Sequence, residues 1–563
     1  MPWWVGLPIG VACVCVGGVL TADPFRSLSV LDWLVAAGLI VAGAGELAWA
    51  TGSRSPWLAR AAGLVWLAGG VLAAAWRGIS LEPLAAVVGA ALIAGGIARL
   101  GSAVAHAGEE RLVLALGGLT SGIVGVLALA WPEATVLVLA IVFGLAIFVF
   151  GVGQIVLAVR RGRELRWPRP LRLAGAAAGL VLALAGVAAS AVVHGSSPAR
   201  PGPFYAAPAP LPPGPPGTIV RSEELDGYHA GATTYRVLYK STGFDKRPTA
   251  VSGLVLVPRG IVPPKGIVAY AHGTVGVAPN CAPSLAKPSV NPLFFEGGAA
   301  LLAAGFAIAA PDYQGLGTAG PHPYLVGESE ARDTLDAVRA ARRLTGLGPR
   351  FAVWGHSQGG QASLFTGQLA RTYARELKLV AVAAGAPASN LVELFKINVT
   401  TLIGKVLVSM ALDSWSKVYS APLSEILSRS ARPLVRKIAR SCLYDQAQIL
   451  AAVPSALLLK LSFLRQPPWQ VEPWKSIVAQ NTPGAARIPV PVLVTQGGAD
   501  RIIPPGVQAA FVGRLCDEGD RVDFRTLPGV GHLEGGHEAA PQVERWLADR
   551  FAGKRAATTC PQP

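Results

Sequence analysis

Residues 351–360, FAVWGHSQGG, decide the fold of the second half of the chain. Their apolar start, 351–354, predicts a buried strand, and the residues after Ser357 have the apolar spacing of a helix. The turn between them has the pattern Gly-x-Ser-x-Gly, in which the two glycines let strand and helix pass closely. The serine hydroxyl is then exposed above the sheet, so Ser357 is the expected nucleophile.

A serine hydroxyl becomes a useful nucleophile only beside a base that an acid orients. In a strand–turn–helix arrangement of this kind, the acid and then the histidine follow the serine along the chain. Asp500 comes after a predicted strand at 492–495 and two glycines, and His532 comes after a predicted strand at 522–527. The sequence therefore predicts a catalytic triad of Ser357, Asp500 and His532.

Four other titratable residues fit these roles less well. Glu534 and His537 follow the predicted base, and His356 lies inside the serine turn, where orienting or packing is expected. Asp312 follows a predicted strand but precedes the serine, which is the wrong order for the acid.

Attack on a carbonyl also needs two N–H donors for the oxyanion that forms. One should be the backbone N–H of Gln358, directly after the serine. The other should come from the loop after a predicted strand at 266–271, where the N–H of Gly273 and that of Thr274 fit equally well. These residues imply no metal ion and no organic cofactor.

Short β-like runs alternate with amphipathic helical segments from residue 218 onward. Further strands are predicted at 251–257 and 306–310, and a helix at about 328–345. Such alternation predicts a mostly parallel sheet with helices on both sides. We expect this domain to span 218–552, with a tail at 553–563.

Apolar runs dominate the first 193 residues. The whole chain is 52% hydrophobic and only 15% charged, which departs from soluble proteins in the direction of membrane proteins. Seven runs have about the 20 residues that a helix needs to cross a bilayer. They lie near 4–21, 29–50, 58–76, 83–103, 112–131, 134–158 and 171–193.

The first six runs repeat as three helical hairpins. The tripeptide Gly-Val-Leu recurs at 18–20, 70–72 and 125–127. The second helix of each hairpin carries two glycines two helical turns apart, which share one face and predict a close helix contact. These pairs are Gly38 and Gly45, Gly89 and Gly96, and Gly144 and Gly151.

This glycine pattern and the hairpin tip at 131–133, Trp-Pro-Glu, resemble the HdeD-like family of small acid-resistance membrane proteins. The resemblance covers roughly residues 5–160 and implies a membrane-embedded helical bundle.

Arginines crowd alternate loops between the apolar runs, and positive loops usually stay in the cytoplasm. This placement predicts a cytoplasmic N-terminus and a second half on the extracytoplasmic side of the cell membrane. Reading 1–22 as a cleaved signal peptide is disfavoured, because no basic segment precedes the apolar run. The positive loops hold Arg54, Arg60, Arg99, Arg111, Arg160, Arg161, Arg163, Arg166, Arg169 and Arg172, and the others hold Arg26 and Arg77.

A proline-rich stretch at 194–217 separates the two halves. It cannot continue a helix and should form an extended, semi-rigid linker.

The chain carries a formal net charge of +16. Nucleic-acid binding is not expected, because no basic helix, finger motif or aromatic–basic alternation accompanies this charge. A basic exterior suits the neighbourhood of anionic lipid.

Several segments of the second half resemble, in the correct order over roughly 200–550, the secretory lipase family of the lipase A type. The resemblance implies an α/β-hydrolase fold with a helical cap, export, and hydrolysis of lipid esters. Ser357, Asp500 and His532 fall on the family's triad positions, whereas the N-terminal bundle departs from its soluble secreted members. The segments include HGTVGVAPNCAPS from His272, PDYQGLG from Pro311, GHSQGG from Gly355, NTPG from Asn481 and PVLVTQGGADRIIPP from Pro491.

Four cysteines in an exported domain would fit two disulfides. The family resemblance implies that Cys281 pairs with Cys442, which leaves Cys516 and Cys560 as the residual pair.

The interval of 143 residues between Ser357 and Asp500 exceeds what a bare sheet needs. Apolar, helical stretches at about 390–480 predict a cap insertion. It could be an ordinary packed insertion, or a lid whose apolar inner face receives an acyl chain.

The expected function is that of a membrane-anchored serine ester hydrolase, a lipase or carboxylesterase, whose partners are a lipid ester and the lipid bilayer. Two alternatives remain open. The same triad could transfer an acyl group to an alcohol or sugar of the envelope. The membrane bundle could also be the functional part, in a stress or transport role, with the hydrolase as an accessory.

Overall fold

The computed structural model describes residues 56–75, 81–130, 169–195, 199–261, 263–444, 446–459 and 463–561, with a few isolated positions before 56 and between 131 and 168. The chain divides into two compact units at residues 196 and 197, with 457–461 grouped with the first unit. This division lies within the proline-rich stretch, and each unit is described by itself.

Long apolar helices make up the described part of the first unit. They are α3 (Pro56–Ala75), α4 (Leu81–Val104), α5 (Gly108–Ala130) and α7 (Arg169–Gly195), at four of the predicted runs. Among the described residues, Ala86–Val104 and Gly108–Ala130 are long and apolar enough to cross a membrane. The runs at 4–21, 29–50 and 134–158 lie essentially outside the described residues, so seven spans remain a prediction.

The predicted glycine contact is present between α4 and α5. A Cβ placed on Gly89 would lie 2.9 Å from the carbonyl oxygen of Gly125, and one on Gly96 would lie 2.7 Å from that of Gly118. Only glycine lets the two backbones approach this closely, as is common where helices pack in lipid. The prediction is confirmed for Gly89 and Gly96, and the other two pairs lie outside the described residues.

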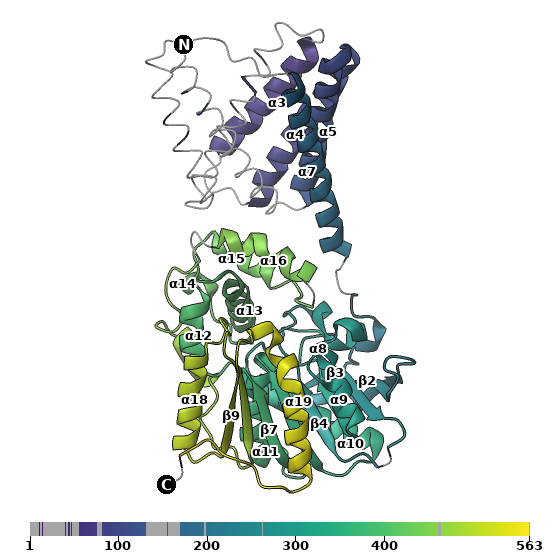
Figure 1. The fold of residues 1–563 in the computed structure, drawn as a ribbon, viewed down its shortest axis with the longest axis vertical. Helices are drawn as coiled ribbons and strands as arrows, with labels where there is room; N and C mark the ends of the chain where they lie inside the picture. The colour runs from purple at the N-terminus through teal and green to yellow at the C-terminus, as the bar shows by residue number, and fades with distance from the viewer. Residues whose placement is uncertain are drawn as a thin grey trace. The chain divides into compact units, whose positions relative to one another are not determined.

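The second unit is built around a nine-stranded sheet (Figure 1). The strand order is β1-β2-β3-β5-β4-β6-β7-β8-β9, antiparallel from β1 to β5 and parallel from β5 to β9. The bounds are β1 (Ile219–Glu224), β2 (Ala232–Thr242), β3 (Pro248–Pro258), β4 (Ile267–Ala271), β5 (Ala307–Pro311), β6 (Arg350–His356), β7 (Lys378–Gly385), β8 (Val492–Gly497) and β9 (Val522–Leu527).

The sheet is mostly parallel, as predicted, and each strand expected from the sequence is present. The sequence did not predict β1, β2 and β7. The reason is composition: β1 is IVRSEE and largely polar, and β7 is KLVAVAAG, rich in alanine and glycine, which have low strand propensity.

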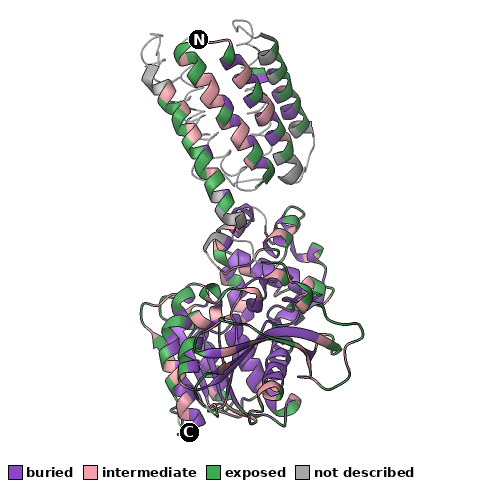
Figure 2. Ribbon diagram, turned by 90° about the vertical axis from the view of Figure 1, so that its right-hand side faces the viewer, coloured by how far each residue is buried: buried purple, intermediate pink, exposed green. Residues whose placement is uncertain are grey.

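Helices cover both faces of the sheet, and in Figure 2 most of the sheet is buried. On one face lie α10 (Gly327–Thr345), α11 (Gln358–Tyr373) and α18 (Pro505–Asp517), and on the other lie α9 (Gly298–Ala303) and α19 (His532–Phe551). Along β4, Ile267 and Ala269 join the first apolar cluster, whereas Val268 and Tyr270 join the second. This alternation is what a strand buried on both faces requires.

A helical insertion lies between β7 and β8, at one end of the sheet in Figure 1. It occupies the interval predicted for the cap. Its helices are α12 (Leu391–Asn398), α13 (Leu402–Val418), α14 (Leu423–Ile426), α15 (Ala431–Ile438), α16 (Gln446–Leu458) and α17 (Trp474–Gln480).

Two disulfides tie the second unit together. Cys281–Cys442 joins the region after β4 to the cap, and Cys516–Cys560 joins α18 to the C-terminal tail. Both expected pairings are present. The tail is not free, because the N–H of Thr559 donates to the carbonyl of Val522 on the edge strand β9.

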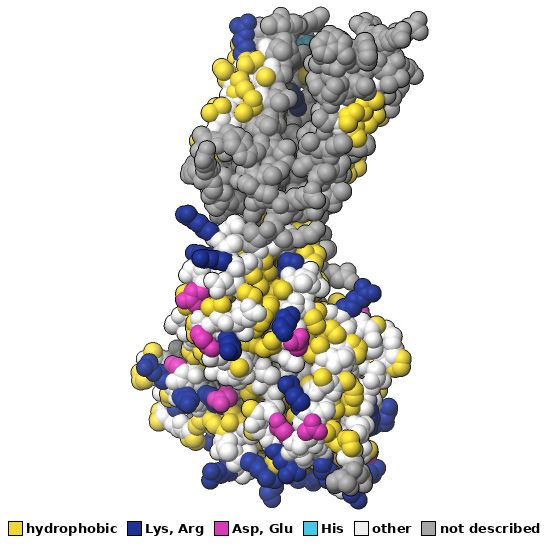
Figure 3. Space-filling view, turned by 90° about the vertical axis from the view of Figure 1, so that its left-hand side faces the viewer, with side chains coloured by type: hydrophobic (Ala, Val, Ile, Leu, Met, Phe, Trp, Pro, Cys, Tyr) yellow, Lys and Arg dark blue, Asp and Glu magenta, His cyan; other side chains and the backbone are white. Residues whose placement is uncertain are grey.

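Lysine and arginine side chains gather at the lower end of the second unit in Figure 3. The excess of Lys and Arg over Asp and Glu in the sequence is therefore visible on the surface of this unit.

Candidate active site

Ser357 lies between β6 and α11, in a strained turn. Its backbone has φ 59° and ψ −117°, a conformation that residues with a Cβ rarely adopt. Gly355 and Gly359 both face the carbonyl oxygen of Ala271, and a Cβ on either glycine would collide with that oxygen. The expected strand–turn–helix is therefore present, with both glycines where the close approach requires them.

The structure brings the three predicted triad residues together. Nε2 of His532 lies 2.9 Å from Oγ of Ser357, and Nδ1 of His532 lies 2.7 Å from Oδ2 of Asp500. Asp500 follows β8, and its Oδ1 accepts the N–H groups of Ile502 and Ile503 at 2.9 and 2.8 Å. His532 is the first residue of α19, so it lies where the expected glycine-rich loop meets a helix.

Burial is the largest influence on the pKa of both titratable partners. It lowers the pKa of His532 below its ordinary 6.5, although the hydrogen bond to Asp500 acts in the opposite direction. Burial raises the pKa of Asp500, but the hydrogen bond from His532 and two backbone N–H donors hold that pKa below its ordinary value. The pair is therefore a carboxylate beside a neutral imidazole, the charge state that base catalysis needs.

The two predicted sources of oxyanion donors lie close to the serine. Gln358 begins α11, where the first N–H groups of a helix have no partner within it. A Cβ on Gly273 would lie 3.9 Å from Cβ of Ser357, and both Gly273 and Thr274 line the same cavity as Ser357. His272 fixes this loop through its Nδ1, 2.6 Å from the carbonyl of Gly273.

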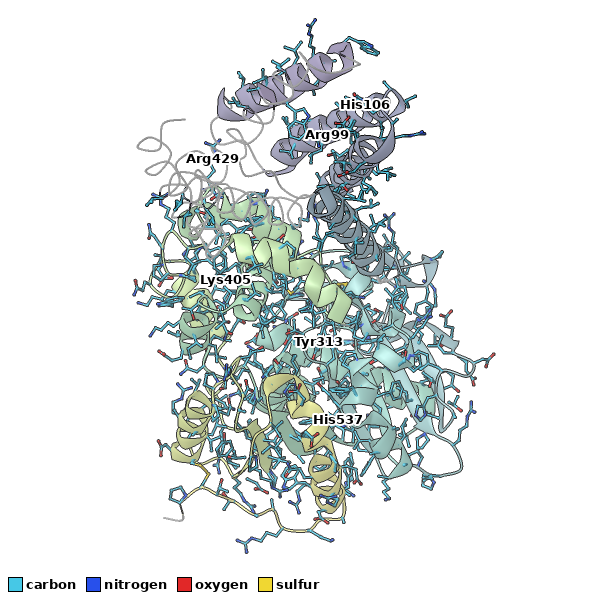
Figure 4. The ribbon with its side chains drawn as sticks, turned by 45° about the horizontal axis from the view of Figure 1, so that its top comes forward. Arg99, His106, Tyr313, Lys405, Arg429 and His537 are labelled. Atoms are coloured by element: carbon cyan, nitrogen blue, oxygen red, sulfur yellow. A yellow bond between two sulfur atoms is a disulfide. The ribbon has the colours of Figure 1, made fainter. Side chains whose placement is uncertain are left out.

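Three of the four weaker candidates have other contacts. Both carboxylate oxygens of Asp312 accept hydrogen bonds, from Ser252 and from Ser284. His537, labelled in Figure 4, extends from α19 and lies 2.9 Å from the carbonyl oxygen of Phe295. His356 packs its ring against that of His532, with the centroids 4.8 Å apart, as its expected packing role requires.

Ser357 and His532 open into a cavity of about 330 Å³ with mostly apolar walls. The cap helix α13 contributes Ile403, Val406 and Leu407, and α16 contributes Ile449. Sequence reasoning did not single out Phe295, Glu296 or Leu533, which also line this cavity. No motif marks these residues, because packing of distant segments brings them here.

Among the residues that the structure describes, no group of three or more His, Cys, Asp or Glu is arranged to hold a metal ion.

Comparison with known proteins shows what the second unit is similar to. Residues 298–559 match the secretory lipase family. The chain is 28% identical over 387 residues to a probable inactive lipase of Mycobacterium tuberculosis, covering 64% of this chain and 85% of that protein. It is 26% identical over 396 residues to a secreted triacylglycerol lipase of Malassezia globosa, covering 64% and 81%.

Solved structures share the fold of the second unit. Candida antarctica lipase A superposes with a TM-score of 0.54 at 19% identity, covering 65% of this chain and 90% of that one. A rice cell wall degrading esterase from Xanthomonas oryzae superposes with a TM-score of 0.50 at 21% identity, covering 61% and 100%. The α/β-hydrolase fold is thus confirmed, and the family match places the domain among the carboxylic ester hydrolases.

The first unit matches a short repeat of unknown function, DUF308, at residues 61–128 and again at 116–189. The two matches begin at residues 61 and 116, an offset equal to one of the intervals between the Gly-Val-Leu repeats. The repeated nature of this unit and its resemblance to HdeD-like proteins are confirmed.

Proposed function

We propose that this protein is a membrane-anchored serine ester hydrolase that acts on lipid esters at the outer face of the membrane. One observation carries the proposal: Asp500, His532 and Ser357 form a hydrogen-bonded chain that ends in an apolar cavity. These hydrogen bonds matter because one relative is described as a probable inactive lipase and another as a secreted triacylglycerol lipase. Family membership alone therefore does not decide activity.

The proposed reaction is acyl transfer to water in two steps. Nε2 of His532 takes the proton of Ser357 as Oγ bonds to the ester carbonyl carbon, and the carbonyl electron pair moves to oxygen. The N–H of Gln358 and that of Gly273 or Thr274 stabilise this oxyanion. His532 then gives its proton to the leaving alcohol, and a water molecule activated in the same way releases the acid.

The cavity favours an acyl chain as the group bound beside Ser357. Its walls are formed by aliphatic side chains of α13 and α16 together with Val290, Pro292 and Phe295, and these exclude water from the ester. A cap that supplies part of the wall must move for a long chain to enter. Lipid esters therefore fit the cavity better than strongly polar esters do.

Apolar surface on the first unit supports membrane anchoring. Ile97, Val126 and Leu182 are 63%, 57% and 71% exposed, values that suit contact with lipid rather than water. The two disulfides of the hydrolase favour an oxidising compartment. Together with the arginine-rich loops, these features support a cytoplasmic N-terminus and an extracytoplasmic hydrolase.

The test is hydrolysis of p-nitrophenyl esters, from acetate to palmitate, by the detergent-solubilised full chain and by its Ser357→Ala variant. We expect activity that rises with acyl length and falls by at least roughly 10³-fold in the variant. Equal rates for both proteins would refute the proposal. Ser357-dependent formation of new esters with an added alcohol or sugar, at the expense of free acid, would instead identify an acyltransferase.

A further inference from the structure

A second acid–imidazole pair, Glu296 and His356, lies beside the base of the triad. Nδ1 of His356 is 3.4 Å from Oε1 of Glu296, and the ring of His356 lies at 39° to that of His532 with centroids 4.8 Å apart. His356 and Glu296 are only 5% and 7% exposed. The triad reaction described above uses neither of them, although both line the cavity.

The Glu296 carboxylate is buried without a strong cation beside it. Its Oε2 accepts a hydrogen bond of 2.7 Å from the hydroxyl of Tyr270, and its Oε1 faces Nδ1 of His356. Within the described part of the chain no lysine or arginine forms an ion pair with it. A negative charge in such a place is weakly screened, so it acts on neighbouring groups more strongly than it would in water.

The helix that begins with His532, α19, has glycines where it packs against Glu296 and His356. Gly535 and Gly536 are consecutive in α19, although glycine disfavours a helix relative to alanine. A Cβ on Gly536 would lie 2.8 Å from the Glu296 carboxylate, and a Cβ on Gly535 would lie 3.1 Å from Nε2 of His356. The two glycines are therefore explained by the room that Glu296 and His356 need.

We propose that Glu296 is a positioning residue that stabilises the protonated form of His532, with His356 holding the two groups apart and in place. When His532 takes the proton of Ser357, its ring becomes positive beside His356 and the carboxylate behind it. The proton stays on His532, and neither Glu296 nor His356 receives it. The inference rests on the proposed function, because it concerns the same base.

The groups that face His532 favour or oppose protonation of its ring. Asp500 at Nδ1 and Glu296 behind His356 favour the protonated ring, whereas Ser357 at Nε2 is neutral before attack. His356 acts in the opposite direction, because its ring contacts that of His532 and lowers the pKa of His532.

The test compares Glu296→Gln with Trp354→Phe in the full chain. Glu296→Gln keeps the shape of the side chain but removes its charge. Trp354→Phe removes the 3.1 Å hydrogen bond from Nε1 to the backbone carbonyl of Glu296 and leaves the charge intact. The readouts are the pH profile of ester hydrolysis and the melting temperature, with rates normalised to the sites labelled by a fluorophosphonate.

In Glu296→Gln, kcat at the pH plateau should fall about tenfold with little change in KM, which is less than the roughly 100-fold or larger loss typical of a missing oxyanion donor. The acid limb of its profile should move to lower pH, because protonated His532 has lost a stabilising charge. Trp354→Phe should melt at a lower temperature with an unmoved acid limb.

A wild-type profile and plateau in Glu296→Gln would overturn the positioning role, as would an equal displacement of the acid limb in Trp354→Phe. Hydrolysis that survives Ser357→Ala would overturn the proposed function itself. The two failures are therefore distinguishable in one set of proteins.

Discussion

His532 is buried between Ser357 and Asp500, and burial lowers the pKa of its imidazole. A general base works only while neutral, so activity should be lost as pH falls through this lowered pKa. We expect kcat/KM to be constant near neutral pH and to fall along an acid limb whose midpoint lies below 6.5, the ordinary value for histidine. In the variant Asp500→Asn the plateau value of kcat/KM should fall by roughly 10³- to 10⁴-fold, because the asparagine no longer holds His532 in the tautomer that base catalysis needs. A midpoint above 6.5 would contradict this assignment of the base.

The same residues show how far sequence reasoning reaches into the site. Ser357, Asp500 and His532 could be selected because a glycine-flanked turn and the order of strand ends are local features of the chain. Glu296 could not, because only the packing of distant segments brings this residue, which follows α8 (Pro292–Phe295), against His356 and α19. No motif carries that contact. The choice between Gly273 and Thr274 as oxyanion donor stays open for a similar reason, since it depends on where a substrate carbonyl would lie.

At the scale of elements, α10 buries three carboxylates, which is unusual for one helix. Burial raises the pKa of Glu330 to about 8, of Asp333 to about 7 and of Asp336 to about 6, against partial compensation by hydrogen bonds from groups such as Ser241 and Gln358. Folded-state pKa values above the unfolded ones mean that the native state binds more protons, so stability is full at low pH and falls as pH rises. The free energy of unfolding in urea should therefore decline between about pH 4 and pH 8. Glu330→Gln should flatten that decline, and an unchanged pH slope in this variant would refute the explanation.

Strands and helices could be predicted from the sequence where their pattern of apolar residues was strong. The two-sided apolar strands β4, β6 and β8 were predicted, as was α10 with its single apolar face. The alanine-rich β7 was missed because only its place between β6 and β8 makes it a strand. In the first unit, glycine spacing predicted a helix contact that hydropathy alone could not, since every face of those helices is apolar.

At the scale of the whole molecule, a repeat-built unit of apolar helices is joined to a hydrolase that carries two disulfides. Disulfides persist outside the reducing cytoplasm, and arginine-rich loops stay inside it, so both features predict the same orientation. The proposed anchoring predicts that the full chain remains in the membrane fraction after an alkaline carbonate wash, because apolar helices embedded in a bilayer resist this extraction. Protease added to intact spheroplasts should cleave within the linker at 194–217 and release an active hydrolase fragment. A cytoplasmic marker protein must survive in the same sample. Protection of the hydrolase until the membrane is permeabilised would reverse the proposed topology, and it would place Cys281–Cys442 and Cys516–Cys560 in a compartment where they would be reduced.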